Sequence, residues 1–336
     1  MDVENLLVVP KNPVALRYEC AQMVSLGCKC SVGDQLHPSG RIDEETYRII
    51  GEAYKEVEER EEWLEDAEPV ADVAILAPSA ILKDRKYEKS EIGAGLMLLE
   101  NQIPFVLLDE TMDVAPYKVL ILPDCVTIDK ALKAKLDKYL AAGGAMILSG
   151  ESGLDPERKR FVFDIGGAYE GPSPWDVEYV VAGEAISKGL VRSPFLVYQS
   201  GVKIKPKDGE VLADAWQPYF NRTYGHFCSH RNTPYDKPAG WPAVIRKGNI
   251  IHIAQPLFRV YEDQGMQLHR DLFRNCLDLL YEDRLVETRL PSCAARASLM
   301  RQRRSLSPRG TGRSPPRNAS SSICSMPTQS SEGQRR

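Results

Sequence analysis

The segment Val70-Ala-Asp-Val-Ala-Ile-Leu-Ala77 is the first of four short apolar runs that decide the fold. Similar runs follow at 103–108, 117–123 and 145–149. Runs that are apolar on both faces and alternate with helices are typical of a parallel sheet covered by helices. The sequence therefore predicts an α/β domain that is flavodoxin-like in outline.

The segments around these runs complete the predicted domain. Helical periodicity places helices at 90–102 and 129–142, and a closing amphipathic helix at 265–281. Between them, residues 150–240 are rich in Gly and Pro and predict an irregular β-rich insertion. Residues 242–255 predict a hairpin that turns at Lys-Gly-Asn.

Residues 1–66 predict a helix, a strand, a loop and a second helix. Gly27 is expected to end the first helix, Cys28 to Val32 to form the strand, and Asp43 to begin the second helix. The predicted buried stripe of the second helix is Tyr47, Ile50, Tyr54 and Val57. One such unit leaves its strand without neighbours, so it either docks on the following domain or is the last part of a (β/α)8 barrel.

Three polar residues, Asp34, Gln35 and His37, follow the predicted strand directly. Polar side chains at the carboxyl end of a strand in an α/β protein tend to line a pocket. We therefore predict that they belong to a site. The alternative is a solvated turn between a strand and a helix.

Composition excludes several classes of partner. The 336 residues carry a formal net charge of −4, which gives no reason to expect nucleic acid or an anionic membrane as partner. No apolar run reaches transmembrane length, and the first residues lack the features of a signal peptide, so a cytoplasmic location is expected. Eight cysteines without a Cys-X-X-Cys pair fit reduced thiols, and no cofactor is expected.

The C-terminal residues, 286–336, change in character. They begin like the start of a further β domain, and after about residue 302 they become low-complexity Arg, Ser and Pro sequence. Such a composition cannot bury enough surface to fold, so we expect disorder there. The tail is either a natural basic extension or the product of a frameshift, and we favour the frameshift.

Three stretches carry a family resemblance: the run that begins with Gly33-Asp-Gln-Leu-His-Pro-Ser-Gly-Arg-Ile-Asp43, residues 218–234, and residues 252–261. They resemble multidomain glycoside hydrolases of the α-L-fucosidase-like group, including hypothetical glycosyl hydrolases with a β-galactosidase-type trimerisation domain. The resemblance implies a (β/α)8 barrel, then a class I glutamine-amidotransferase-like α/β domain that mediates oligomerisation, then a small β domain.

The resemblance assigns residues 1–66 to the end of the barrel and 67–285 to the amidotransferase-like domain. Glycosidases of the barrel type use two carboxylates, and in this family these would lie on earlier strands. We therefore expect a glycoside hydrolase fragment of α-L-fucosidase or β-galactosidase type that is weak or inactive alone. The expected partners are an oligosaccharide or glycoside and further copies of the chain. The alternative is a non-catalytic oligomerisation module.

The stretch 218–234 adds candidate site residues. His226, Cys228 and His230 alternate, so on a strand they would share one side and invite a metal interpretation. Without a fourth ligand nearby, we favour a polar loop that reaches a sugar site or a neighbouring subunit. Under the resemblance, substrate binding is predicted for Asp34, Gln35, His37, Asn221, Arg222, His226 and His230.

Ser149 ends an apolar run at the position where class I glutamine amidotransferases carry their nucleophilic cysteine. A nucleophile elbow needs small residues two positions away on either side, and here Ile147 and Glu151 stand there. Ala-Gln-Pro at 254–256 replaces the family's histidine motif. We therefore expect a scaffold without amidotransferase chemistry.

Overall fold

The computed structural model describes residues 12–25, 27–34, 37–64, 67–284 and 300–302. These residues form two compact units: the first holds residues up to Val70 together with 300–302, and the second begins at Ala71. Each unit is described by itself below.

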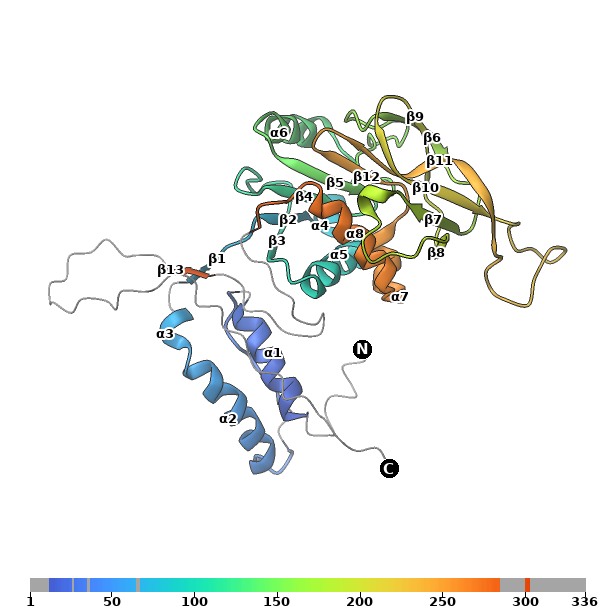
Figure 1. The fold of residues 1–336 in the computed structure, drawn as a ribbon. Coiled ribbons are helices and arrows are strands. Elements are labelled where there is room, and N and C mark those ends of the chain that lie inside the picture. Colours follow the sequence, from blue (N-terminus) through green and yellow to red (C-terminus); the bar gives the residue numbers. More distant parts are fainter. Residues whose placement is uncertain (1–11, 26, 35–36, 65–66, 285–299, 303–336) are drawn as a thin grey trace. The chain divides into compact units, whose positions relative to one another are not determined.

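The second unit is built on a nine-stranded sheet whose two halves differ in direction (Figure 1). The first half is parallel, and its spatial order is β3 (Phe105–Leu108), β2 (Val73–Leu76), β4 (Val119–Leu122), β5 (Ala145–Ser149), β12 (Ile250–Ile253). The second half is antiparallel and continues with β11 (Tyr235–Lys247), β10 (Glu210–Pro218), β7 (Glu178–Ala182), β8 (Phe195–Val197). The four predicted apolar runs are confirmed as strands of the parallel half.

Helices cover both faces of the parallel half (Figure 1). Two clusters of buried side chains separate the layers, because alternate residues of each strand point to opposite faces. One face packs against α5 (Glu88–Glu100), α7 (Leu257–Gln264) and α8 (Gln267–Asp278). The other packs against α6 (Lys130–Ala141) and a two-stranded ribbon of β6 (Gly167–Pro172) and β9 (Val202–Pro206). Short turns complete the unit: α4 (Pro78–Leu82), η2 (Arg85–Tyr87) and η3 (Glu184–Ile186).

Two predictions for this unit need correction. Residues 150–240 are β-rich, as predicted, but they are part of the main sheet rather than an insertion, since β7, β8 and β10 extend it. The predicted closing helix at 265–281 is preceded by a second helix, α7, which ends at Gly265 with φ +59°. Only glycine adopts that conformation without strain, so the glycine ends one helix and turns the chain into the next. The predicted hairpin is confirmed, because Val244 pairs with Ile253 across the turn.

The first unit is smaller. It consists of α1 (Pro13–Ser25), α2 (Glu44–Glu58) and α3 (Glu61–Leu64), with β1 (Ala67–Pro69) paired to β13 (Met300–Gln302). Its buried apolar side chains are Leu16, Cys20, Ile49 and Ala53. Asn12 caps the start of α1, since its side-chain oxygen accepts a hydrogen bond from the backbone N–H of Val14 at 2.9 Å.

Two expectations for this unit are wrong. The residues from Cys28 to Val32 form no strand, because no described segment lies beside them to complete a ladder. The predicted stripe of α2 is wrong in part: Ile49 and Ala53 are its buried residues and Tyr47 and Tyr54 are exposed, whereas Ile50 and Val57 are half-buried and pack against the cluster. The helix packs on α1 and on the segment around Cys30, whose carbonyl accepts a hydrogen bond from the Tyr54 hydroxyl at 3.3 Å.

Candidate functional site

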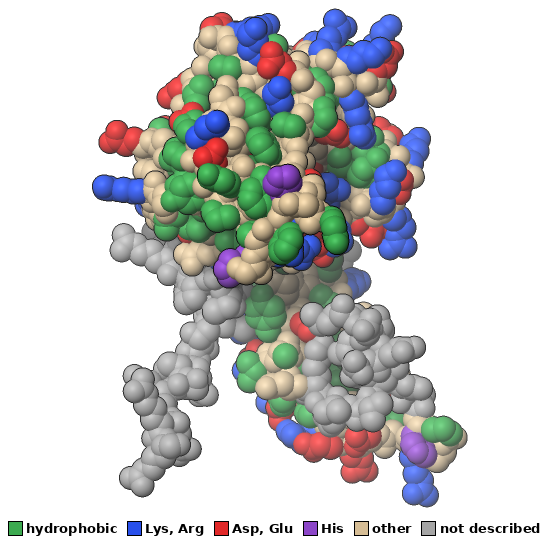
Figure 2. Space-filling view, turned by 90° about the vertical axis from the view of Figure 1, so that its right-hand side faces the viewer, with side chains coloured by type: hydrophobic (Ala, Val, Ile, Leu, Met, Phe, Trp, Pro, Cys, Tyr) green, Lys and Arg blue, Asp and Glu red, His purple; other side chains and the backbone are tan. Residues whose placement is uncertain are grey.

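Strands β10 and β11 run out to a loop, residues 219–234, which we call the aromatic loop (Figure 1). Three aromatic side chains on it are largely exposed: Tyr219 (67%), Tyr224 (101%) and Phe227 (69%). His226 and His230 are exposed as well. Figure 2 faces this side of the unit and shows hydrophobic side chains gathered on it, with a histidine beside them. Large aromatic groups in water are typical of a contact surface.

Asn221 binds the aromatic loop to the segment that precedes β7. Its Oδ1 accepts from the backbone N–H of Asp176 at 3.0 Å, and its Nδ2 donates to the carbonyl of Pro174 at 2.7 Å. At the other end of the loop, the Tyr179 hydroxyl donates to the carbonyl of Thr233 at 2.6 Å. The predicted site residue Asn221 therefore has a positioning role.

The tip of the loop is held by its own polar groups. Arg222 Nη1 and Cys228 Sγ both donate to the carbonyl of His230, at 3.3 and 3.2 Å. Residues 219–234 contain no strand, so His226, Cys228 and His230 do not share a strand face. No group of three or more His, Cys, Asp or Glu side chains in the described ranges is placed to hold a metal ion.

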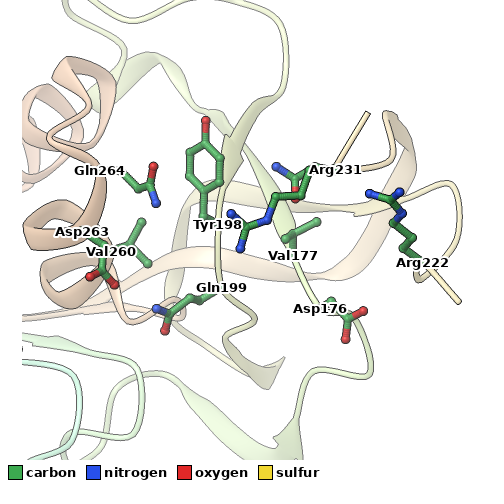
Figure 3. Close-up of a pocket in the computed structure, with 10 residues that line it drawn as sticks. Asp176, Val177, Tyr198, Gln199, Arg222, Arg231, Val260, Asp263 and Gln264 are labelled. Atoms are coloured by element: carbon green, nitrogen blue, oxygen red, sulfur yellow. The ribbon is translucent and has the colours of Figure 1, made fainter. Parts of the chain in front are cut away.

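A pocket of about 440 Å³ lies beside the aromatic loop (Figure 3). Segments far apart in the sequence form its walls: the start of β7, the end of β8, the aromatic loop and helix α7. The lining side chains are Asp176, Val177, Tyr198, Gln199, Arg222, Arg231, Asn232, Val260, Asp263 and Gln264. Figure 3 shows the side chain of Arg231 directed between Tyr198 and Gln199, toward the residues of α7.

Two of the charged groups in this pocket are held by neighbours. Arg222 is fixed by the carbonyl of His230. Asp263 pairs with Lys89, and the hydrogen bond from that ammonium group lowers the pKa of the Asp263 carboxyl. The pocket therefore has a wall whose polar groups are already oriented.

Glu178, the first residue of β7, lies directly behind the pocket wall and is fully buried. Its Oε2 accepts from Gln255 Nε2 at 2.8 Å and from the backbone N–H of Gly201 at 3.2 Å. Burial raises the pKa of this carboxyl, because the charged form loses its hydration. Glu178 thus connects three segments behind the pocket.

Ser149 is a buried structural residue. Its Oγ donates to Asp124 Oδ1 at 2.6 Å and accepts from the backbone N–H of Asp124 at 2.8 Å. Asp124 in turn accepts from the N–H of Arg259 at 2.7 Å at the start of α7. The side chain of Ser149 is 0% exposed, and within the described residues no histidine bonds to it. This arrangement lacks the base that activates a serine nucleophile.

The remaining predicted site residues lie in the first unit. His37 and Asp34 are exposed, and His37 Nδ1 bonds to the hydroxyl and backbone N–H of Ser39, at 2.8 and 3.1 Å. Gln35 lies outside the described residues. Their role in binding stays a prediction.

Sequence reasoning missed five pocket residues, Asp176, Tyr198, Gln199, Arg231 and Gln264. Four of them lie outside the stretches that the sequence analysis singled out, in irregular segments or at the end of α7, and Arg231 lies in the stretch 218–234 but was not selected within it. Only the fold brings them together. The one weak signal was the density of polar residues around Arg222 and Arg231.

The family of the second unit is established by comparison. Residues 97–280 match the model of the β-galactosidase trimerisation domain, and these residues make up more than half of the chain. The chain therefore belongs to this family. No curated protein matches it.

Solved structures extend this result. The chain is similar to α-L-fucosidase isoenzyme 2 from Paenibacillus thiaminolyticus, with 35% identity and a TM-score of 0.80 over 87% of this chain and 45% of that one. It resembles in fold a β-galactosidase from Rahnella sp. R3 (17% identity, TM-score 0.56, 80% of this chain and 40% of that one). A β-galactosidase from the psychrophilic Marinomonas ef1 is similar in fold as well (13% identity, TM-score 0.54, 85% of this chain and 43% of that one).

The chain is thus a glycoside hydrolase-like protein, and it spans less than half the length of these solved structures. Within its described residues, no helix is long and apolar enough to cross a membrane.

Proposed function

We propose that this chain is part of a glycoside hydrolase that cleaves O-glycosidic bonds and is of α-L-fucosidase or β-galactosidase type. The observation that carries the proposal is the 35% identity to an α-L-fucosidase over 87% of this chain. Residues 1–66 would be the end of a (β/α)8 barrel, 67–285 an amidotransferase-like α/β domain, and 286–336 the start of a β domain with its tail. Substrate glycosides and a cytoplasmic location belong to the same proposal.

In this proposal the two catalytic carboxylates lie outside this chain. The described residues of the first unit supply two packed helices and a short third one, but no parallel strands to hold such a pair. The predicted site residues would contact the substrate without acting as its catalytic carboxylates: Asp34, Gln35, His37, Asn221, Arg222, His226 and His230. Their donor and acceptor groups suit sugar hydroxyls.

The test is hydrolysis of aryl α-L-fucosides and aryl β-galactosides by the purified chain alone. We expect no turnover above the enzyme-free rate. Robust turnover would contradict the absence of the carboxylates. The DNA on both sides tests the wider proposal, since an upstream frame should encode the remainder of a barrel.

A second function, oligomerisation, is favoured by the exposed aromatic loop and by the match to a trimerisation domain. We propose that copies of the chain associate through this surface. Sedimentation should give a mass above that of one chain, and Tyr224→Ser combined with Phe227→Ser should lower it. Val191→Ser is the matched control, because Val191 is an exposed apolar residue (45%) outside the loop. A monomeric mass for the unchanged protein would refute association.

A further inference from the structure

The pocket beside the aromatic loop contains polar groups that no neighbour satisfies. The side chains of Asp176, Tyr198, Gln199, Arg231 and Gln264 make no hydrogen bond or ion pair with any part of the chain that the structure describes. They come from four separate segments, and they face one space of about 440 Å³ (Figure 3). Small-molecule pockets have volumes of about 300 to 1,000 Å³.

The charges of the lining restrict the ligand. Arg222 and Arg231 are balanced by Asp176 and Asp263, so the pocket has no excess of either sign. A phosphate or another strong anion would meet two carboxylates, and a cation would meet two guanidinium groups. Only Val177 and Val260 are aliphatic, which disfavours an apolar ligand. The lining therefore suits an uncharged molecule with many hydrogen-bonding groups.

The free groups fit vicinal hydroxyls. A carboxylate accepts two hydrogen bonds, a guanidinium donates from a planar fork, and each glutamine amide both donates and accepts. The Tyr198 ring adds an aromatic face beside them (Figure 3). A sugar ring presents this combination of adjacent hydroxyls and C–H groups.

We propose that this pocket is a binding site for a neutral mono- or disaccharide, with Arg231 and Asp176 as its main polar contacts. Arg231 reaches the pocket from the aromatic loop, whereas Asp176 lies on the segment to which Asn221 ties that loop. The Asp176 backbone supplies this tie, and its carboxylate remains available to the ligand. The choice of sugar rests on the proposed glycoside hydrolase function.

Isothermal titration calorimetry of the full chain with L-fucose, D-galactose and lactose tests the site. We expect at least one of them to bind, and Arg231→Met and Asp176→Asn each to weaken it by about tenfold or more, because each removes a charge-assisted hydrogen bond. The matched controls are Arg192→Met and Asp214→Asn, since both residues are exposed and lie outside the pocket. These should bind as the unchanged protein does.

Three outcomes would overturn the proposal: no saccharide binds, both pocket variants bind normally, or D-glucuronate or inorganic phosphate binds in place of the neutral sugars. Unchanged circular dichroism of the variants confirms that they fold, as expected for exposed positions. A chain that is catalytically inactive alone and binds no sugar refutes this site and leaves the proposed function standing. A chain that hydrolyses glycosides by itself contradicts the placement of the carboxylates without affecting the pocket.

Discussion

The two units of this chain bury very different amounts of apolar surface. The second unit has one cluster of 30 buried apolar residues and another of 20, one on each face of its sheet. The described residues of the first unit have a cluster of four. Burial is the main favourable contribution to folding, so this cluster contributes far less than the two clusters of the second unit. Among the described residues, the stability of this chain is therefore concentrated in the second unit.

The largest difference between the two units should be in how a glycine-to-alanine substitution changes the free energy of unfolding. A Cβ on Gly93 in α5 would lie 1.9 Å from the carbonyl oxygen of Phe258 in α7. We expect Gly93→Ala to lower the free energy of unfolding of the second unit by about 3 kcal/mol or more, because two helix backbones must move apart. Urea unfolding followed by tryptophan fluorescence measures this loss.

Gly51→Ala is the control from the first unit. Gly51 lies in α2, and nothing lies within 4 Å of a Cβ built there. Alanine should therefore stabilise the helix by about 0.5–1 kcal/mol through its higher helix propensity. Equal effects of the two substitutions would show that the helices of the second unit are not in close contact.

The rate at which cysteines react with an alkylating reagent should also differ between the two units. Cys28 is exposed, whereas Cys276 in α8 is buried, and burial raises the pKa of its thiol to about 12. Iodoacetamide should modify Cys28 about 100-fold faster, because the thiolate is the reactive form. Peptide mass spectrometry reads each cysteine separately. In urea the two rates should converge, and equal rates in the native protein would contradict the buried position of α8.

The smallest effect should be a pH dependence confined to the second unit. The pKa of Glu178 is raised by burial, so the native state binds its proton more tightly than the unfolded chain does. Its contribution to stability is full below the unfolded pKa and is lost as pH rises through the native pKa. The loss is about 1.4 kcal/mol for each unit by which the pKa is raised.

Glu178→Gln is the test of this dependence. The neutral amide oxygen can accept the bonds from Gln255 and Gly201, and it does not titrate. The variant should therefore lose part of the decline in stability that urea titrations should detect in the unchanged protein as pH rises above the unfolded pKa of glutamate, about 4.3. An identical pH profile for both proteins would show that Glu178 titrates normally.

The sequence predicted the parallel strands well because each is a short apolar run, and all but the edge strand β3 are buried on both faces, as in Val119–Leu122. It failed where structure depends on distant neighbours. The strand expected at Cys28 needs a partner strand, and whether one exists is not a local property. At His226 the sequence favoured a polar loop over a strand, and residues 219–234 do form an irregular loop.

The candidate site was predictable only in part. Arg222 lines the pocket, as a sugar-contact role would require, and Asn221 positions the loop. Gln199 follows β8, and Gln264 is the last residue of α7, which lies far from β8 in the sequence. The two side chains line the same pocket only because the whole sheet places β8 and α7 near each other. That information is not contained in the spacing of residues.

The pairing of β12 with β5 has a consequence for how this protein acquires its structure. Ile250 lies beside Met146 in the sheet, and the whole antiparallel half and its ribbon lie between them in the chain. The parallel half cannot be completed during synthesis until β12 has left the ribosome. Closing so long a loop before the contacts form slows folding. Until then the free edge of β5 is open to other chains, so this edge is where misassembly during expression should begin.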